Sequence, residues 1–401
     1  MKPLLAGQIN SAGFEPGRAH HAGMELGRFK RLPGGVCGNT WVFSSAPPKE
    51  SYLQPKNVLS TEMGQSQQNI QKIPEESRIE RMSLEIRKFQ PIEYERFAQI
   101  YNSSFPNNPF SAHELKAWDD NLDKTKYYFQ RYSCYNKQTS EMLGVGALGH
   151  VPWMFNPRKY QARIFVDKNH QNKGVGQFIY ESLMKQLVDL QAVAAYAWAK
   201  EDDTIALSFL ANRGFTEMFR TWESWLNPVQ VNQSKFHQYA ERASNAGIEI
   251  TSLAHELEHD PECYRKLYEL NQELMGDVPL PEPYSRIPYE QWLSFDMKDP
   301  GLVPEVYSIA KDGAKYVGLS SVRRLDKEPH GLWQALTGVT RQYRGKGIAF
   351  AMKLKVLDYA REKGYERIKT DNATNNTPML SINMKLGFNR QTGWVNFSKT
   401  I

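Results

Sequence analysis

Apolar residues recur at strand and helix spacing along much of the chain, and near its end they predict a strand, a turn and a helix in close succession. Residues 336–339 form a short apolar strand, 344–349 a glycine-rich turn, and 348–363 carry apolar residues at helical spacing. A helix entered through such a turn presents unpaired backbone N–H groups and the positive end of its dipole. The pattern therefore predicts an anion site suited to a pyrophosphate.

The same pattern occurs twice. Val166, Gln171, Gly174 and Gly176 stand in the same order as Val339, Arg344, Gly347 and Ala349, at one constant offset of 173 positions (339 − 166). The pairs Gly214-Phe215 and Gly387-Phe388 follow at that offset as well. Two ungapped blocks at one offset indicate an internal duplication.

The remaining pattern divides the chain into segments. We expect residues 1–81, which are rich in Gly, Pro and Gln, to be a disordered N-terminal extension. A first domain is expected at 82–228, a polar linker at 229–246 and a second domain at 247–401. Predicted strands are 84–86, 143–148, 162–166, 193–199, 248–250 and 367–370, with two more near 307 and 317; predicted helices are 94–101, 178–188, 203–214, 261–274, 378–386 and one around 291.

The spacing Gln/Arg-x-x-Gly-x-Gly/Ala, followed by an Asp/Asn-started helix that ends in Gly-Phe, resembles the GNAT superfamily of N-acetyltransferases in both copies. The resemblance covers residues 82–401 and implies the α/β class (an α+β mixed sheet) with two tandem GNAT-like acyl-CoA N-acyltransferase domains. It implies acetyl-CoA in the splay of a central strand pair and acetyl transfer to an amine. The cofactor-binding residues that it implies are Val339, Arg344, Gly345, Lys346, Gly347, Ala349 and Asn376 in the second copy, and Val166, Gln171, Lys173, Gly174 and Gly176 in the first.

Many relatives carry a tyrosine four residues before the Gly of Gly-Phe as the acid that protonates the leaving thiolate. Here that position is Leu210 in the first copy and Asn383 in the second. Leucine donates nothing and asparagine donates a hydrogen bond, so we expect the chemistry in the C-terminal domain with Asn383 as its candidate catalytic residue. The Pro-rich loop with Asp277, Glu282 and Tyr284 is a candidate for acceptor contacts, because an ammonium favours acidic walls.

Composition adds limits on partners and compartment. The net charge is +6, but residues 1–81 supply half of that excess and no dense basic helix follows, which argues against nucleic-acid binding. Three distant cysteines, Cys37, Cys134 and Cys263, suit a reducing compartment, and no apolar run reaches the length of a membrane span. We expect a cytoplasmic enzyme that needs no metal and engages no membrane.

Two other functions compete with this one. His255-Glu256-x-x-His259 matches a zinc-protease signature, although Asp260-Pro261 interrupts the helix that such a site requires. A non-catalytic CoA-binding or scaffolding protein is also compatible with the missing tyrosine. The acceptor is left open among a polyamine, an antibiotic, an amino acid, a thiol-pathway intermediate and a protein amine.

Overall fold

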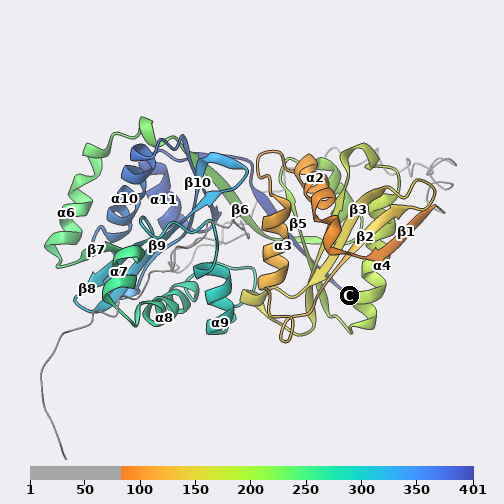
Figure 1. Ribbon diagram of the computed structural model, residues 1–401, viewed down its shortest axis with the longest axis horizontal. Helices are drawn as coiled ribbons and strands as arrows, with labels where there is room; N and C mark the ends of the chain where they lie inside the picture. Colours follow the sequence, from red (N-terminus) through yellow and green to blue (C-terminus); the bar gives the residue numbers. More distant parts are fainter. Residues whose placement is uncertain (1–82) are drawn as a thin grey trace, which may run out of the picture. The chain divides into compact units, whose positions relative to one another are not determined.

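The computed structural model describes residues 83–401, so the expected disorder of 1–81 lies outside the described residues. Figure 1 shows the described chain as strands of one continuous sheet with helices on both faces. The first half comprises β1 (Leu84–Lys88), α2 (Tyr94–Ser104), α3 (Ala112–Asn121), β2 (Phe129–Asn136), β3 (Met142–Gly149), β4 (Lys159–Val166), α4 (Val175–Asp189), β5 (Ala194–Lys200), α5 (Thr204–Ala211) and β6 (Thr216–Leu226).

The second half repeats this order of elements, as the duplication predicts. It comprises β7 (Glu249–Ser252), α7 (Leu253–His259), α8 (Cys263–Met275), α9 (Tyr289–Trp292), β8 (Ser308–Asp312), β9 (Lys315–Leu325), β10 (Glu328–Val339), α10 (Ile348–Glu362), β11 (Arg367–Ala373), α11 (Thr377–Leu386), β12 (Asn389–Arg390) and β13 (Trp394–Thr400). The expected linker is not extended: it holds two short 3-10 turns, η4 (Pro228–Gln230) and η5 (Gln233–Phe236), and the helix α6 (His237–Asn245).

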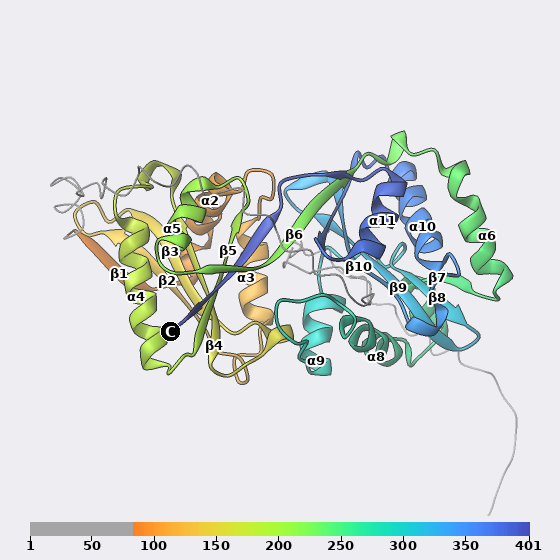
Figure 2. The same cartoon turned by 180° about the vertical axis from the view of Figure 1, so that it is seen from behind.

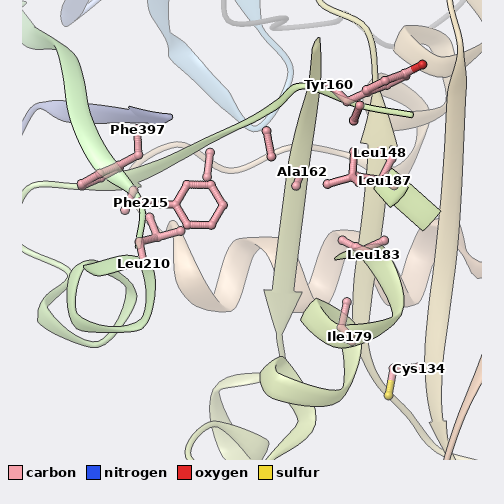
Figure 3. Packing of buried hydrophobic residues seen from close by; sticks show 14 of the residues in the cluster. Cys134, Leu148, Tyr160, Ala162, Ile179, Leu183, Leu187, Leu210, Phe215 and Phe397 are labelled. Carbon is pink, nitrogen blue, oxygen red and sulfur yellow. The ribbon is translucent and has the colours of Figure 1, made fainter. Parts of the chain in front are cut away.

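Burial patterns explain why the helices lie where they do. In α4 the buried residues Val175, Ile179, Leu183 and Leu187 recur every four positions and form one apolar side. Figure 3 shows Ile179, Leu183 and Leu187 along that side, in the same cluster as Leu148 and Ala162 of the sheet. This packing fixes α4 against the sheet and so positions the turn at its beginning.

The two faces of the sheet carry different helices. In β4, Ile164 and Val166 join the apolar cluster that contains the buried side of α4, whereas Phe165 packs with Phe97 and Tyr101 of α2. Successive strand residues point to opposite faces, so α4 covers one face and α2 the other. A ligand bound between β4 and β5 would therefore be accessible from both faces of the sheet.

The last strands of the two halves are exchanged. The strand order is β1-β2-β3-β4-β5-β13-β6-β11-β10-β9-β8-β7, which places β13 of the second half between β5 and β6 of the first. β13 is antiparallel to both neighbours, and β6 in turn pairs with β11. Figure 2 shows β6 extending between the strands of the two halves. The sheet thus crosses the expected domain boundaries at 228 and 247.

Each half contains a parallel strand pair that diverges, as the resemblance implies. β4 and β5 pair only through Lys159–Gln161 and Ala194–Tyr196, and β10 and β11 only through Gly331–Trp333 and Arg367–Lys369. Beyond these residues, the two strands of each pair form no ladder hydrogen bonds with each other. A gap opens there in each half, beside the glycine turn.

Candidate functional site

The two glycine turns have the same backbone conformation. Gly174 is the N-cap of α4 with φ of 88°, and Gly347 is the N-cap of α10 with φ of 82°. These angles lie in the left-handed region, which glycine enters without steric cost. Both glycines therefore begin a helix whose first N–H groups have no partner within the helix.

A cavity of about 750 Å³ lies in the first half, next to its turn and gap. Four of the expected cofactor residues line it, namely Val166, Gln171, Gly174 and Gly176, whereas Lys173 is exposed and is not part of the lining. The floor is formed by the unpaired parts of β4 and β5, and α4 and α5 form one wall. The cavity thus joins a helix N-terminus to an opening through the sheet.

The two turns differ in what covers them. A methyl group placed on Gly174 would meet no atom within 4 Å, whereas one placed on Gly347 would overlap the backbone carbonyl of Tyr239 in α6. Tyr239 stacks on Phe350 of α10 with ring centroids 4.1 Å apart, and Phe236 stacks on the same ring at 5.8 Å. The helix α6 therefore lies over the turn of the second half and leaves the turn of the first half open.

The cations expected at the second turn already have partners. Arg344 donates from Nε to the carbonyl of Val339 at 2.9 Å, and its guanidinium forms an ion pair with Asp277, which also pairs with Arg341. Lys346 lies over the ring of Tyr343, 4.8 Å from its centroid. In the first half Gln171 makes the equivalent contact to Val166 O at 3.4 Å. The shared role of this position is thus to tie the turn to the end of its strand.

Buried polar side chains occupy the space between α10, β10 and β11. Lys353 Nζ donates to Gln334 Oε1 at 2.6 Å, and Gln334 Nε2 donates to Ser320 at 3.1 Å. Burial lowers the pKa of Lys353 to about 7. Asn383, the candidate catalytic residue, is 2% exposed and donates to Asn372 Oδ1 at 2.7 Å. These side chains therefore have partners within the second half.

The residues that begin the later helices act as caps in both halves. Asn376 accepts a hydrogen bond from Met379 N at 3.3 Å at the start of α11, and Asp203 accepts one from Ala206 N at 2.9 Å at the start of α5. Asp203 also lines the cavity, whereas Asn376 is fully buried.

Replacing Asp203 with alanine should lower the free energy of unfolding by about 1 kcal/mol, because α5 loses its N-cap. Asp203→Asn should have almost no effect, since asparagine caps equally well. Urea unfolding of the two variants measures the difference. Equal losses in both would show that the carboxylate charge, and not the cap, stabilises α5.

The expected acceptor residues Asp277, Glu282 and Tyr284 lie in three separate environments. Asp277 holds the two arginines of the second turn. Glu282 accepts from Lys159 and from Tyr196, each at 2.7 Å, at the paired end of β4 and β5. Tyr284 donates to Gln272 at 2.7 Å. The loop thus ties the two halves together, and none of the three lines the cavity.

The His-Glu-x-x-His segment is the short helix α7. His255 and His259 stack with centroids 4.1 Å apart, and the carboxylate of Glu256 is buried against Lys311 at 3.0 Å and Tyr316 at 2.6 Å. Among residues 83–401, no group of three His, Cys, Asp or Glu side chains is arranged to hold a metal ion. Glu256 thus serves an ion pair with β8 and a hydrogen bond with β9.

Several lining residues were not anticipated from the sequence. Tyr180 of α4 brings its hydroxyl to the cavity and accepts from Lys399 at 3.2 Å, while Arg163, Phe165 and Trp198 line it from the strands. Tyr180 is one turn after Gly176, which is a spacing that could have indicated it.

None of the helices in the described part of the chain is long and apolar enough to cross a membrane.

Comparison with solved structures shows which proteins have a similar fold. The chain is similar in structure to a GCN5-related N-acetyltransferase from Sphaerobacter thermophilus, with 16% identity and a TM-score of 0.58, over 82% of this chain and 97% of that one. It is also similar to a tandem GNAT protein from the clavulanic acid biosynthesis pathway, with 15% identity and a TM-score of 0.57, over 79% and 98% of the chains. These identities establish the fold alone. No curated protein matches.

A family model matches the sequence in both halves of the chain. The Acetyltransferase (GNAT) family matches residues 94–215 and again residues 264–388, so that each half carries one match. Together the two segments make up more than half of the sequence and coincide with the repeat in both order and extent. The chain therefore belongs to the GNAT family of acetyltransferases, with two copies of the family domain in tandem.

Proposed function

We propose that the protein is an acetyl-CoA-dependent N-acetyltransferase that binds its cofactor in the first half of the chain. The observation that carries this proposal is the contrast between Gly174, which is open to the cavity, and Gly347, which is covered by α6. Sequence reasoning placed the chemistry in the C-terminal half because Asn383 retains a polar group. Its burial and its bond to Asn372 favour a structural role instead.

The residues of the cavity fit a nucleotide thioester. The N–H groups at the start of α4, with Gly174 and Gly176, would hold the diphosphate, because a helix N-terminus favours anions and glycine permits close approach. The gap between β4 and β5 would take the pantetheine arm, with backbone groups near Val166 beside the thioester. Acetyl-CoA supplies the acyl carbonyl that the amine attacks.

The chemistry divides between the two faces of the sheet. The amine nitrogen would approach from the face of α2 and form the amide bond as the carbon–sulfur bond breaks; the amine loses a proton and the thiolate gains one. Leu210 cannot supply that proton. Of the two lining residues with a hydroxyl group, Ser104 and Tyr180, the phenol of Tyr180 is the one acidic enough to donate it.

The second half then has a structural role in this proposal. Its turn is covered by α6, Lys353 of α10 is bonded to Gln334 of β10, and its last strand completes the sheet beside β5. A non-catalytic CoA-binding protein is the second candidate, because Leu210 replaces the family acid. It predicts acetyl-CoA binding without thiol release for any amine.

Two measurements test the proposal. Calorimetric titration should give one acetyl-CoA per chain, and acetyl-CoA at a hundred times its Kd should stabilise the fold by about 2.7 kcal/mol, seen as a rise in Tm. An amine panel followed by release of the CoA thiol should identify turnover. Binding without release from any amine would support the second candidate, and no binding would refute both.

A further inference from the structure

The wall of the cavity on the face of α2 and α3 is built differently from the cofactor side. It contains Ser104 and Phe105 at the end of α2, Arg163 and Phe165 of β4, and Trp198 of β5. Arg163 and Phe165 are two residues apart on one strand and therefore point to the same face, opposite to Ile164 and Val166. If the cofactor enters along α4, this wall faces the acceptor.

Arg163 is a cation without a carboxylate partner among the described residues. Its Nε donates to Gln161 Oε1 at 2.6 Å, and the guanidinium carbon lies 4.6 Å from the centroid of the Trp118 ring. Neither contact neutralises the charge. Burial lowers the pKa of Arg163 to about 10, which leaves the group charged at neutral pH.

The described charged side chains around Arg163 include a second arginine but only one nearby carboxylate, so its positive charge is not balanced. Arg131, Ala147 and Arg163 are cross-strand neighbours on β2, β3 and β4. The carboxylate of this region is Asp119, and Arg131 binds both of its oxygens at 2.8 to 3.1 Å. Tyr94 donates to the same carboxylate at 2.7 Å. Two guanidinium groups thus lie near this carboxylate, and Arg131 is the one that binds it.

An uncompensated charge inside a protein is destabilising unless a ligand neutralises it. The Nη groups of Arg163 have no hydrogen-bond partner among the described residues and can form the paired bonds that guanidinium makes with a carboxylate. The guanidinium is a donor only, so the wall is suited to an anion and not to a second ammonium.

The apolar part of the wall completes the picture. The ring of Phe165 lies 6.0 Å from that of Trp198, which packs edge-on against Trp394 at 4.8 Å, and Phe105 contacts all three rings. Rings of this kind favour an apolar or aromatic side group next to the charged end of a ligand.

We propose that the acceptor amine carries a carboxylate, which Arg163 binds, so that the substrates are amino-acid-like molecules with an apolar side group. This inference rests on the proposed function in the first half. It names Arg163 as a specificity-determining residue that holds the acceptor carboxylate while the amine faces the β4–β5 gap.

The experiment compares acceptors with and without the carboxylate, each at a pH where its α-amine is largely deprotonated. L-phenylalanine, L-leucine and L-methionine are each assayed against their carboxamides, with acetyl-CoA and the full chain, by thiol release. The acids should be used at least about tenfold better in kcat/KM, because a hydrogen bond between two charged groups is among the strongest polar contacts. Equal use, or preference for the carboxamides, would overturn the inference without affecting the proposed function.

The variants separate charge recognition from folding. Arg163→Gln should lower kcat/KM for the acids about thirtyfold, mainly through KM, and should leave the carboxamides and acetyl-CoA within about threefold. Arg163→Lys should retain part of the preference. Arg158→Gln removes an exposed cation just before β4 and should change nothing. Equal losses for acids and carboxamides in Arg163→Gln would mean a structural role and refute the proposal.

Two further readouts keep the test decisive. Because Arg163 has no ion pair with a residue of 83–401, Arg163→Gln should keep or raise the Tm of the free protein, and a marked fall would contradict the excess charge. Succinyl-CoA assayed with 2-phenylethylamine asks whether the carboxylate belongs to the acyl donor. Faster turnover of that pair than of acetyl-CoA with L-phenylalanine would overturn the placement on the acceptor.

Discussion

Replacing Gly174 with aspartate is expected to weaken acetyl-CoA binding by at least about a hundredfold and to reduce thiol release to the same extent. The new carboxylate would stand at the N-terminus of α4, where it repels a diphosphate that the helix N–H groups otherwise attract. No atom lies within 4 Å of a methyl group at Gly174, so the side chain fits without a clash. The positive φ should lower the stability by about 1–2 kcal/mol, which circular dichroism can follow.

The matched control is Gly345→Asp in the second turn. Gly345 also has a positive φ, of 79°, and no atom within 4 Å of an added methyl group. The substitution therefore brings the same charge and a similar backbone strain to the other half. Affinity and turnover should stay within about threefold of the parent protein. The opposite pattern, with binding lost only in Gly345→Asp, would return the cofactor to the C-terminal half.

Replacing Asp371 with asparagine is expected to stabilise the protein at alkaline pH. Asp371 of β11 pairs in register with Glu223 of β6, and the two side chains are 5% and 1% exposed. Lys200 lies 3.0 Å from Glu223, while Oδ1 of Asp371 has no hydrogen-bond partner among the described residues. Burial, and then the charge of Glu223, raise the pKa of Asp371 to about 8.

The direction of the pH effect follows from where the proton is held. In the unfolded chain Asp371 ionises near its ordinary pKa of about 4, whereas the folded protein keeps the proton until about pH 8. Between these values the folded state binds more protons, so stability falls as the pH rises. The destabilisation is nearly absent at pH 4 and complete above pH 8.

Asp371→Asn should therefore raise the free energy of unfolding by roughly 5 kcal/mol at pH 8.5 and by roughly 2 kcal/mol at pH 5. Denaturant unfolding at the two pH values measures this difference. Asp326→Asn, at an exposed position between β9 and β10, should stay within about 0.5 kcal/mol at both. A gain in Asp371→Asn that is the same at pH 5 and pH 8.5 would contradict the raised pKa.

The duplication was predictable because the same residues recur at the same short spacings in both halves of the sequence. Gly174 and Gly347 were identified as turn residues, and both have the positive φ that glycine allows. The family and the two-domain mixed fold inferred from these motifs are confirmed by the family matches over both halves. Apolar alternation predicted many of the strands, but β2, β6 and β13 were not among them, and alternation says nothing about which strand lies beside which. The exchange of β6 and β13 was therefore out of reach.

Other features of the site depend on contacts between distant residues. The polar composition of 229–246 suggested a linker, although Phe236 and Tyr239, three residues apart, are the aromatic pair that packs on Phe350. That spacing was a usable signal for a docked helix. The partnership of Arg344 with Asp277 had no such signal, because nothing in sequence joins positions 67 apart. Arg163 was likewise missed, since alternation gives the face of a strand residue but not the presence of a cavity.

The interleaved sheet has a consequence for the gene. β13 separates β5 from β6, so a reading frame shortened to the first copy would leave β5 with bare N–H and C=O groups along one side. Such an open edge recruits other chains and leads to aggregation. A gene that kept the first copy alone would therefore encode a chain with an exposed sheet edge, whichever copy binds the ligand.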